Sequence, residues 1–133
     1  MIKLLDTNAC IQLWQRKNLT VRKHFMQHSP AEIALCSVVK AELLFGALRS
    51  EQKENNLQLL QHLFAPLYSF EFDDNAAKHY AQIRADLTIQ GTLIGANDLL
   101  IAAIARANNA TLITHNTSEF SRVQGLLIED WEI

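Results

Sequence analysis

The sequence predicts an α/β fold in which a mostly parallel central sheet is sandwiched between helices. Five short apolar, β-branched or aromatic segments are typical of strands, and most lack the alternation expected when one face of a sheet meets water. Helical patterns separate them, and strands joined through helices form right-handed units with parallel strands. The chain has 133 residues, 49% of them hydrophobic, and no linker or repeat divides it. We therefore expect a single domain over 1–133.

The expected elements follow one another along the whole chain. The strands are expected at about 2–6, 32–36, 67–72, 111–114 and 126–129. Helical periodicity is expected over 8–16, 20–28, 38–49, 51–64 and 97–107. A strand therefore alternates with one or two helices from the first residues to the last, which is the order that a parallel sheet requires.

The clearest helical pattern lies between the third and fourth strands. Asp73 and Asp74 are candidates for its N-cap, and Gly91 is a typical residue just past its end. Its apolar face carries Ala76, Ala77, Tyr80, Ile83 and Leu87. A face of this kind predicts packing against the core.

Composition excludes several classes of protein. The net charge of −2 offers no global attraction to nucleic acid, so RNA would have to be held by local basic patches or by a metal ion. No apolar run reaches the 18 or more residues of a membrane span, and no signal-peptide core follows Met1, so we expect a cytoplasmic protein that does not contact the membrane. Cys10 and Cys36 lie in apolar segments without CxxC spacing, which predicts buried thiols.

Three carboxylates stand out because their sequence neighbours are apolar. Asp6 ends the first strand and is followed by Thr7 and Asn8, at the edge of a parallel sheet where ligands gather. Any of these three polar residues is also suited to cap the next helix. A functional role for Asp6 is favoured by the two acids that come later.

Glu42 is the second of these acids. It lies in the expected helix over 38–49, where most neighbours are apolar. Lys40 is two residues away and therefore about 200° around the helix, so Lys40 and Glu42 cannot share one narrow solvent stripe. A functional Glu42 is favoured over a solvated one.

Asp98 is the third acid and begins an almost uniformly apolar helix, which is expected to be buried in the centre of the fold. An Asp in the first turn gains from the helix dipole, so a capping role is a real alternative. Asn97 is available as the N-cap, however, and this would leave the Asp98 carboxylate free for other work.

If Asp6, Glu42 and Asp98 converge, three negative charges share one pocket and require neutralisation. Oxygen ligands without His or Cys select Mg²⁺, with Mn²⁺ as a substitute, over Zn²⁺. Such an ion leaves room for substrate phosphate, and the implied chemistry is hydrolysis of a phosphodiester bond by an activated water.

Four ordered motifs resemble the PIN-domain ribonucleases, and within them the VapC-type toxins of bacterial toxin–antitoxin pairs. The motifs are LLDTN at 4–8, VVKAELLFGA at 38–47, IGANDLLIAA at 94–103 and LITHNTSEF at 112–120. The resemblance implies that Asp6 and Asp98 bind the metal and that Glu42 belongs to the same acidic cluster. It also implies that Thr7, Asn8 and Thr114 support that cluster.

The fourth motif departs from the family pattern. Many PIN domains carry a further Asp where this sequence has Asn116, and Glu119 is the nearest acid. Asn116 can hydrogen-bond a ligand or a water but supplies no charge, so a second tightly held metal is in doubt. We expect Glu119 to join Asp6, Glu42 and Asp98 as a catalytic acid, with Asn116 in support.

The resemblance also implies an RNA substrate, with transfer RNA favoured, a VapB-type antitoxin and a homodimer. An Arg of the antitoxin is expected to bridge the acidic cluster. Apolar antitoxin residues would then need an apolar surface, for which the candidates are Ile11, Leu13, Trp14, Leu19, Val21 and Phe25. We expect Trp14 to be partly exposed.

A basic cluster, defined as Arg16, Lys17, Arg22 and Lys23, lies near the first junction between helices. These cations are candidates to bind RNA phosphates, and a solvated turn explains them equally well.

Other functions fit the sequence less well. A PIN-like module that binds RNA or a partner without cleavage would be indicated by a missing acid. A phospho-Asp phosphatase or receiver would need an acid pair beside Asp6, and the pair Asp73–Asp74 is expected to start a helix instead. His24 and His28 have a spacing found in metal sites but lack the HExxH glutamate, which disfavours zinc.

Overall fold

A computed structural model describes residues 1–133 and contains one five-stranded sheet whose strands are all parallel. The strands are β1 (Lys3–Leu5), β2 (Ile33–Cys36), β3 (Tyr68–Phe70), β4 (Thr111–Ile113) and β5 (Leu127–Glu129). Their spatial order is β3-β2-β1-β4-β5, so the chain starts at the central strand β1, and β4 later pairs beside it. The predicted α/β class is confirmed.

The central strands explain why the sequence shows little alternation. All residues of β2 and β4 are buried, as are Leu4 and Leu5 of β1, because helices cover both faces of the sheet there. The edge strands β3 and β5 consist of half-buried and exposed residues. The prediction that helices cover both faces of most strands therefore does not hold for these two. The core therefore lies around the middle of the sheet.

Six of the α-helices, α1 to α6, begin and end within two residues of the expected bounds. The α-helices are α1 (Thr7–Trp14), α2 (Leu19–Met26), α3 (Ser37–Leu48), α4 (Lys53–Phe64), α5 (Asp74–Gln90), α6 (Ala96–Ala107) and α7 (Thr117–Phe120). A short 3₁₀ helix, η1 (Pro30–Glu32), precedes β2. The sequence reasoning missed α7 and η1 because a single turn is too short to show periodicity. None of the helices combines the length and apolar character needed to cross a membrane.

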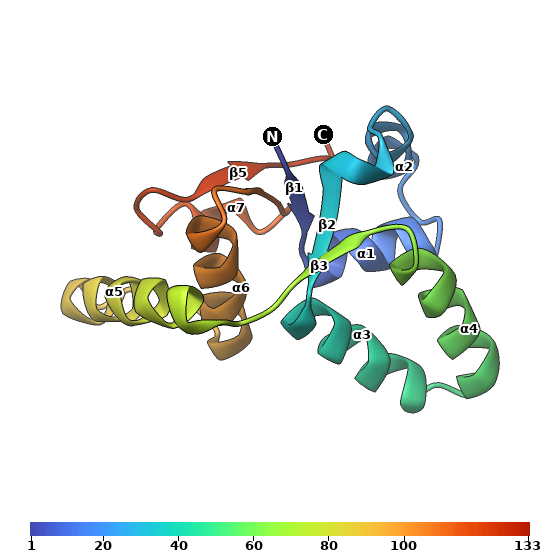
Figure 1. Cartoon of the computed structure of the whole chain (residues 1–133), viewed down its shortest axis with the longest axis horizontal. Coiled ribbons are helices and arrows are strands. Elements are labelled where there is room, and N and C mark those ends of the chain that lie inside the picture. The colour runs from blue at the N-terminus through green and yellow to red at the C-terminus, as the bar shows by residue number, and fades with distance from the viewer.

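Helix α5 has the predicted ends. The Asp73 carboxylate accepts a hydrogen bond from the Ala76 amide, and Gly91 has a φ of +68°, the left-handed conformation that favours glycine at a helix end. The predicted apolar face is wrong at Ala77, which is exposed. Helices α5 and α6 pack together at one end of the molecule, and α3 and α4 pack together at the other (Figure 1).

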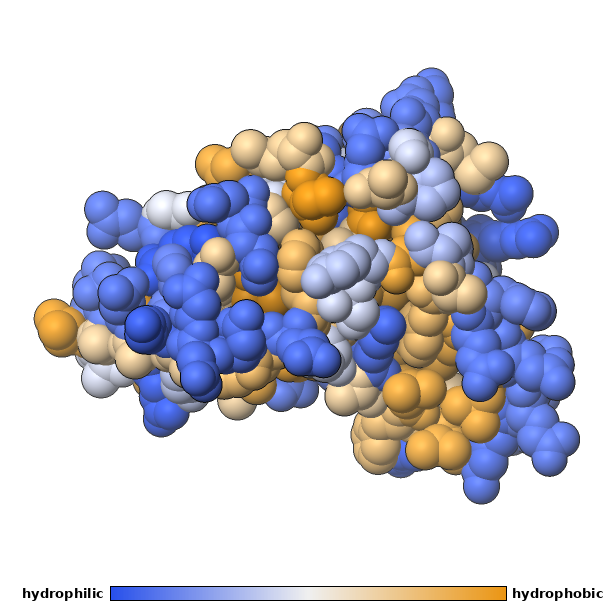
Figure 2. Space-filling view, viewed as in Figure 1, coloured by the Kyte–Doolittle hydropathy of each residue, from blue (hydrophilic) through white to orange (hydrophobic).

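Helix α3 buries only one narrow side. Val39, Leu43 and Ala47 are buried in the core. Leu44, Phe45 and Leu48 are 37%, 59% and 51% exposed. Hydrophobic side chains accordingly gather on the surface over the C-terminal half of α3 (Figure 2). Helix α6, in contrast, is mostly buried as expected, and Cys10 and Cys36 are buried free thiols as expected.

Candidate active site

The predicted site residues lie where the carboxyl ends of β1 and β4 meet. The two strands pair in parallel, with Leu5 opposite Ile113, and the Asp6 amide donates a hydrogen bond of 3.1 Å to the Ile113 carbonyl. This register places Asp6 beside Thr114, the residue that follows β4. The geometry is that expected for ligand sites in parallel sheets.

Asp6 is the most buried acid of the site, with 7% of its surface exposed. It is the N-cap of α1, because its Oδ1 accepts a hydrogen bond of 2.8 Å from the Ala9 amide. The pKa of Asp6 is raised from 3.8 to about 6, chiefly by burial and in smaller part by the charges of Asp98 and Glu132, while the hydrogen bonds from Ala9 and Thr114 act in the opposite direction. The carboxylate is thus held in place, and no cationic side chain of the protein forms an ion pair with it.

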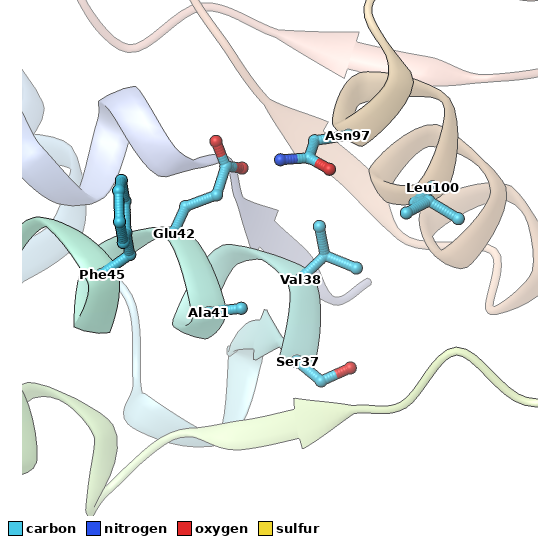
Figure 3. Close-up of a pocket in the computed structure, with 7 residues that line it drawn as sticks. All are labelled: Ser37, Val38, Ala41, Glu42, Phe45, Asn97 and Leu100. Atoms are coloured by element: carbon cyan, nitrogen blue, oxygen red, sulfur yellow. The ribbon is translucent and has the colours of Figure 1, made fainter.

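Glu42 reaches the same region from α3. The Thr7 hydroxyl donates a hydrogen bond of 2.8 Å to Glu42 Oε1 and so ties the first turn of α1 to α3. Glu42 is half-buried and faces Asn97 of α6 across a cavity of about 420 Å³ (Figure 3). The remaining lining residues are Ser37, Val38, Ala41, Phe45 and Leu100. The cavity therefore combines one acid with a largely apolar wall.

Asp98 lies in the first turn of α6, as predicted, but the predicted cap is wrong. The N-cap of α6 is Gly95, which has no side chain to bond, and Asn97 lies inside the helix and lines the cavity instead. Asp98 makes no capping hydrogen bond. Burial raises its pKa, and the nearby charges of Glu119 and Glu42 raise it further. Asp98 is therefore a free carboxylate close to two other acids.

Asn116 and Glu119 stand together at the end of β4. The Asn116 side-chain amide donates a hydrogen bond to Glu119 Oε2, and the Asn116 backbone amide donates one of 3.0 Å to the Thr114 hydroxyl. These bonds orient Glu119, whose charge acts on Asp98. Although Asn116 itself is neutral, Glu119, one turn later, thus brings a carboxylate near Asp98.

The donor set suits a divalent cation. No Lys, Arg or His forms an ion pair with Asp6, Glu42 or Asp98. No three His, Cys, Asp or Glu side chains lie close enough together in this structure to hold a metal ion as a group. An ion such as Mg²⁺ takes only one or two protein carboxylates and leaves its other positions for water and phosphate, and Asp6 and Asp98 are the oxygen donors that fit this requirement.

The site contains residues that the sequence reasoning missed. Glu132, near the C-terminus, is 3.4 Å (Oε2) from Asn8 Nδ2 and acts on the pKa of Asp6. His115 is 2.9 Å (Nδ1) from Asp130 Oδ2. The only sequence indication was the acidic character of the last residues, and a charged terminus is ordinarily solvated.

The basic cluster lies at the other end of α1 from Asp6. All four of its side chains are exposed, and none forms an ion pair with a carboxylate. His24 and His28 both stack with Trp131, with ring centroids 5.4 and 5.2 Å away, and they belong to no group of side chains that could hold a metal ion. The receiver alternative also loses its acid pair, because Asp73 caps α5.

The surface expected to meet a partner is present in part. Ile11, Leu13, Trp14 and Phe25 are half-buried, which bears out the expected partial exposure of Trp14, and Leu19 is exposed. Val21 is buried in the core and does not belong to this surface, because it points from α2 toward the interior. Leu13, Trp14 and Phe25 line a groove of about 250 Å³ with Met26, Leu59 and Leu63, and Arg16 and Arg22 complete its lining.

Comparisons with known proteins agree with this arrangement. The PIN domain family matches residues 3–126. The chain is 38% identical over 128 residues to the tRNA(fMet)-specific endonuclease VapC of Shigella flexneri, with 96% of each chain covered. It is 36% identical over 133 residues to Ribonuclease VapC2 of Rickettsia felis, with 99% of each chain covered.

Solved structures show the same fold. VapBC2 from Rickettsia felis, bound to a DNA fragment from its promoter, matches with a TM-score of 0.92 at 35% identity, over 98% of this chain and 99% of that chain. DNA-bound VapBC from Salmonella typhimurium matches with a TM-score of 0.92 at 34% identity, over 98% of both chains. The chain therefore belongs to the PIN-domain family and, within it, to the VapC ribonucleases.

Proposed function

We propose that the protein is a Mg²⁺-dependent ribonuclease, with Mn²⁺ as a substitute, and that it acts as the toxin of a VapBC toxin–antitoxin pair. PIN-domain VapC nucleases in general depend on divalent metal ions. The observation that carries the proposal is that the charge of Asp98 acts on Asp6 and the charge of Glu42 acts on Asp98, while no cationic side chain forms an ion pair with any of the three. A bound cation would supply the missing positive charge and polarise a phosphodiester.

The residues divide into four roles. Asp6 and Asp98 would hold the metal ion, because Asp6 is buried, Asp98 is half-buried, and neither carboxylate forms an ion pair with a cationic side chain. Glu42 and Glu119 complete the catalytic acids and orient or deprotonate the attacking water. Thr7 holds Glu42 in place, and the remaining supporting side chains are those of Asn8, Thr114 and Asn116. The basic cluster is proposed to bind RNA phosphates outside the acidic centre.

Cleavage is tested with purified protein and a labelled RNA. With Mg²⁺ or Mn²⁺ we expect products with 5′-phosphate and 3′-hydroxyl ends, and EDTA should stop the reaction. Asp86→Asn, which changes an exposed acid of α5, is the matched control and should cleave normally. Cleavage that survives EDTA, or products with cyclic phosphates, would contradict the metal mechanism.

Transfer RNA is the proposed substrate. Relatives from Shigella flexneri and Salmonella typhimurium carry the name tRNA(fMet)-specific endonuclease, and the chain is 38% and 35% identical to them. Sequencing the 5′ ends formed when the protein is induced in cells tests this substrate. Cuts concentrated in messenger or ribosomal RNA would contradict it.

A VapB-type antitoxin is the proposed partner, since matching structures are VapBC complexes. An antitoxin Arg would bridge the acids of the site, where no side chain of this protein does so. Apolar antitoxin residues would pack in the groove lined by Trp14, Phe25 and Leu63. Expression of the protein alone in the cytoplasm should then arrest the growth of the cells. Co-expression of the adjacent small reading frame should relieve the arrest. Unaffected growth at a level where Asp6→Ala accumulates equally would contradict the toxin role.

The proposed assembly contains homodimers, each subunit being a single PIN domain over 1–133. Leu44, Phe45 and Leu48 form an exposed apolar patch in the C-terminal half of α3, which ends beside Arg49. An uncharged patch is complementary to its own copy, so a two-fold contact through α3 would cover both.

A further inference from the structure

The last residues of the chain return to the active site and are fixed there. Trp131 is buried, stacks with both His24 and His28 of the α2 region, and donates a hydrogen bond of 2.9 Å from Nε1 to Glu129 Oε1. Asp130 and Glu132 flank this anchored ring. Their carboxylates are therefore held at the surface beside the end of β4 instead of moving with a free terminus.

These two carboxylates converge on one imidazole. His115 Nδ1 is 2.9 Å from Asp130 Oδ2 and 3.9 Å from Glu132 Oε2. Glu132 is itself held by the side-chain amides of Asn8, at 3.4 Å, and Asn18, at 3.5 Å. The His115 ring is thus oriented through its Nδ1 atom by groups that also contact the first turn of α1.

The other ring nitrogen of His115 is free, and the ring lies near enough to Asp6 for the two charges to interact. No hydrogen bond of the protein uses Nε2, and the side chain is 56% exposed. His115 directly follows Thr114, whose hydroxyl hydrogen-bonds Asp6. A histidine with a carboxylate on Nδ1 and an open Nε2 is the arrangement in which an imidazole exchanges protons with a substrate.

The charges around His115 favour its protonated form. The hydrogen bond to Asp130 and the charges of Glu132 and Asp130 raise its pKa, and Asp6 adds to this effect against a small opposing influence of desolvation. These are the titratable groups that act on the ring from the end of β1 and from the C-terminal segment. These groups therefore favour the imidazolium form, in which both ring nitrogens carry a proton.

We propose that His115 is the general acid of the nuclease and donates its Nε2 proton to the 3′ oxygen that leaves when the RNA backbone is cut. The proposal rests on the proposed function. The oxygen of the attacking water bonds to phosphorus and its proton passes to a carboxylate of the site. The bond between phosphorus and O3′ breaks, its electron pair stays on O3′, and O3′ takes the proton from Nε2. The imidazole then regains a proton from solvent.

The test compares two leaving groups in two proteins. His115→Asn keeps an amide donor where Nδ1 meets Asp130 but has no atom in place of Nε2. One substrate has the natural 3′ oxygen at the cut, and the other has sulfur at that bridging position. A thiolate is a much weaker base than an alkoxide and leaves without a proton. Mn²⁺ is used with both substrates because it binds a sulfur ligand more readily than Mg²⁺ does.

We expect His115→Asn to lose about 100-fold in rate on the oxygen substrate and less than about threefold on the sulfur substrate. The fall in wild-type rate at alkaline pH should also be absent from the variant. His62→Asn, an exposed histidine on α4, is the matched control and should match wild type on both substrates. The melting temperatures of His115→Asn and of a second variant, His115→Gln, check that any loss of cleavage rate does not come from a loss of folding.

An equal loss on both substrates would overturn the proposal, because it would assign His115 to positioning of the C-terminal segment or of the phosphate. Full activity of His115→Asn on the oxygen substrate would overturn it as well, while leaving the nuclease function intact. Wild-type protein that cleaves neither substrate would instead contradict the proposed function itself, and the proposal with it.

Discussion

Replacing Asp6 with Asn is expected to stabilise the metal-free protein at neutral pH while abolishing RNA cleavage. Asn is as good an N-cap as Asp and can still accept the Ala9 amide with its Oδ1 atom, so the start of α1 is retained. The substitution removes only the charge. Because that charge is buried beside Asp98 and Glu132 without a cation, its removal relieves the fold of an unfavourable ion.

The size of the effect follows from the pKa. A tenfold change in proton affinity corresponds to about 1.4 kcal/mol. The rise of the Asp6 pKa from 3.8 to about 6 therefore means that the ionised carboxylate costs the folded state about 3 kcal/mol at pH 7.5. For a chain of this size, such a difference moves the melting temperature by on the order of 10 °C.

The raised pKa of Asp6 also determines whether the stability of the folded protein rises or falls with pH. Between pH about 4 and 6 the folded protein keeps a proton on Asp6 that the unfolded chain has lost, so stability falls as the pH rises through this window. Below pH about 4 both states are protonated, and wild type and Asp6→Asn should melt alike. The two proteins should separate only above that range.

The assay is thermal unfolding in EDTA at pH 4.0 and pH 7.5, followed by addition of Mg²⁺. Mg²⁺ should raise the melting temperature of wild type more than that of Asp6→Asn, because ligand binding to the folded state stabilises it. Asp86→Asn again serves as the control for an exposed acid. An Asp6→Asn protein that melts at or below the wild-type temperature at pH 7.5 in EDTA would refute the reasoning.

Three further substitutions probe the same site. Asp98→Asn should abolish cleavage and leave the fold intact or more stable, because it removes one of several crowded charges. Normal cleavage, or a large drop in melting temperature, would assign Asp98 to a structural role. Thr7→Val should lower the cleavage rate about tenfold because Glu42 loses its charge-assisted hydrogen bond, whereas Thr7→Ser keeps the hydroxyl and should retain activity. Equal rates for the two Thr7 variants would argue against this role. Replacing the whole basic cluster with Gln should weaken RNA binding and flatten its dependence on salt, and an unchanged salt slope would leave these cations as a solvated turn.

The sequence alone determined the features that depend on local pattern. Strand and helix order, the α/β class and the caps of α5 at Asp73 and Gly91 follow from periodicity and from backbone preferences of single residues. The isolated acids Asp6 and Asp98 were recognisable for the same reason, because a carboxylate in an apolar segment is costly to bury without a purpose. These properties are encoded within a few neighbouring residues.

Only the tertiary structure decided which distant residues share the site and which faces remain open. The approach of His115 to Asp130 and Glu132 depends on β4 pairing with β5 in one register, and the contact of Glu132 with Asn8 joins the two ends of the chain. Likewise, α3 is apolar around most of its circumference, so its periodicity could not reveal that Phe45 stays exposed while Leu43 is buried. Periodicity reports how a helix or strand is patterned, whereas strand register and helix packing are set by long-range contacts that no local window contains.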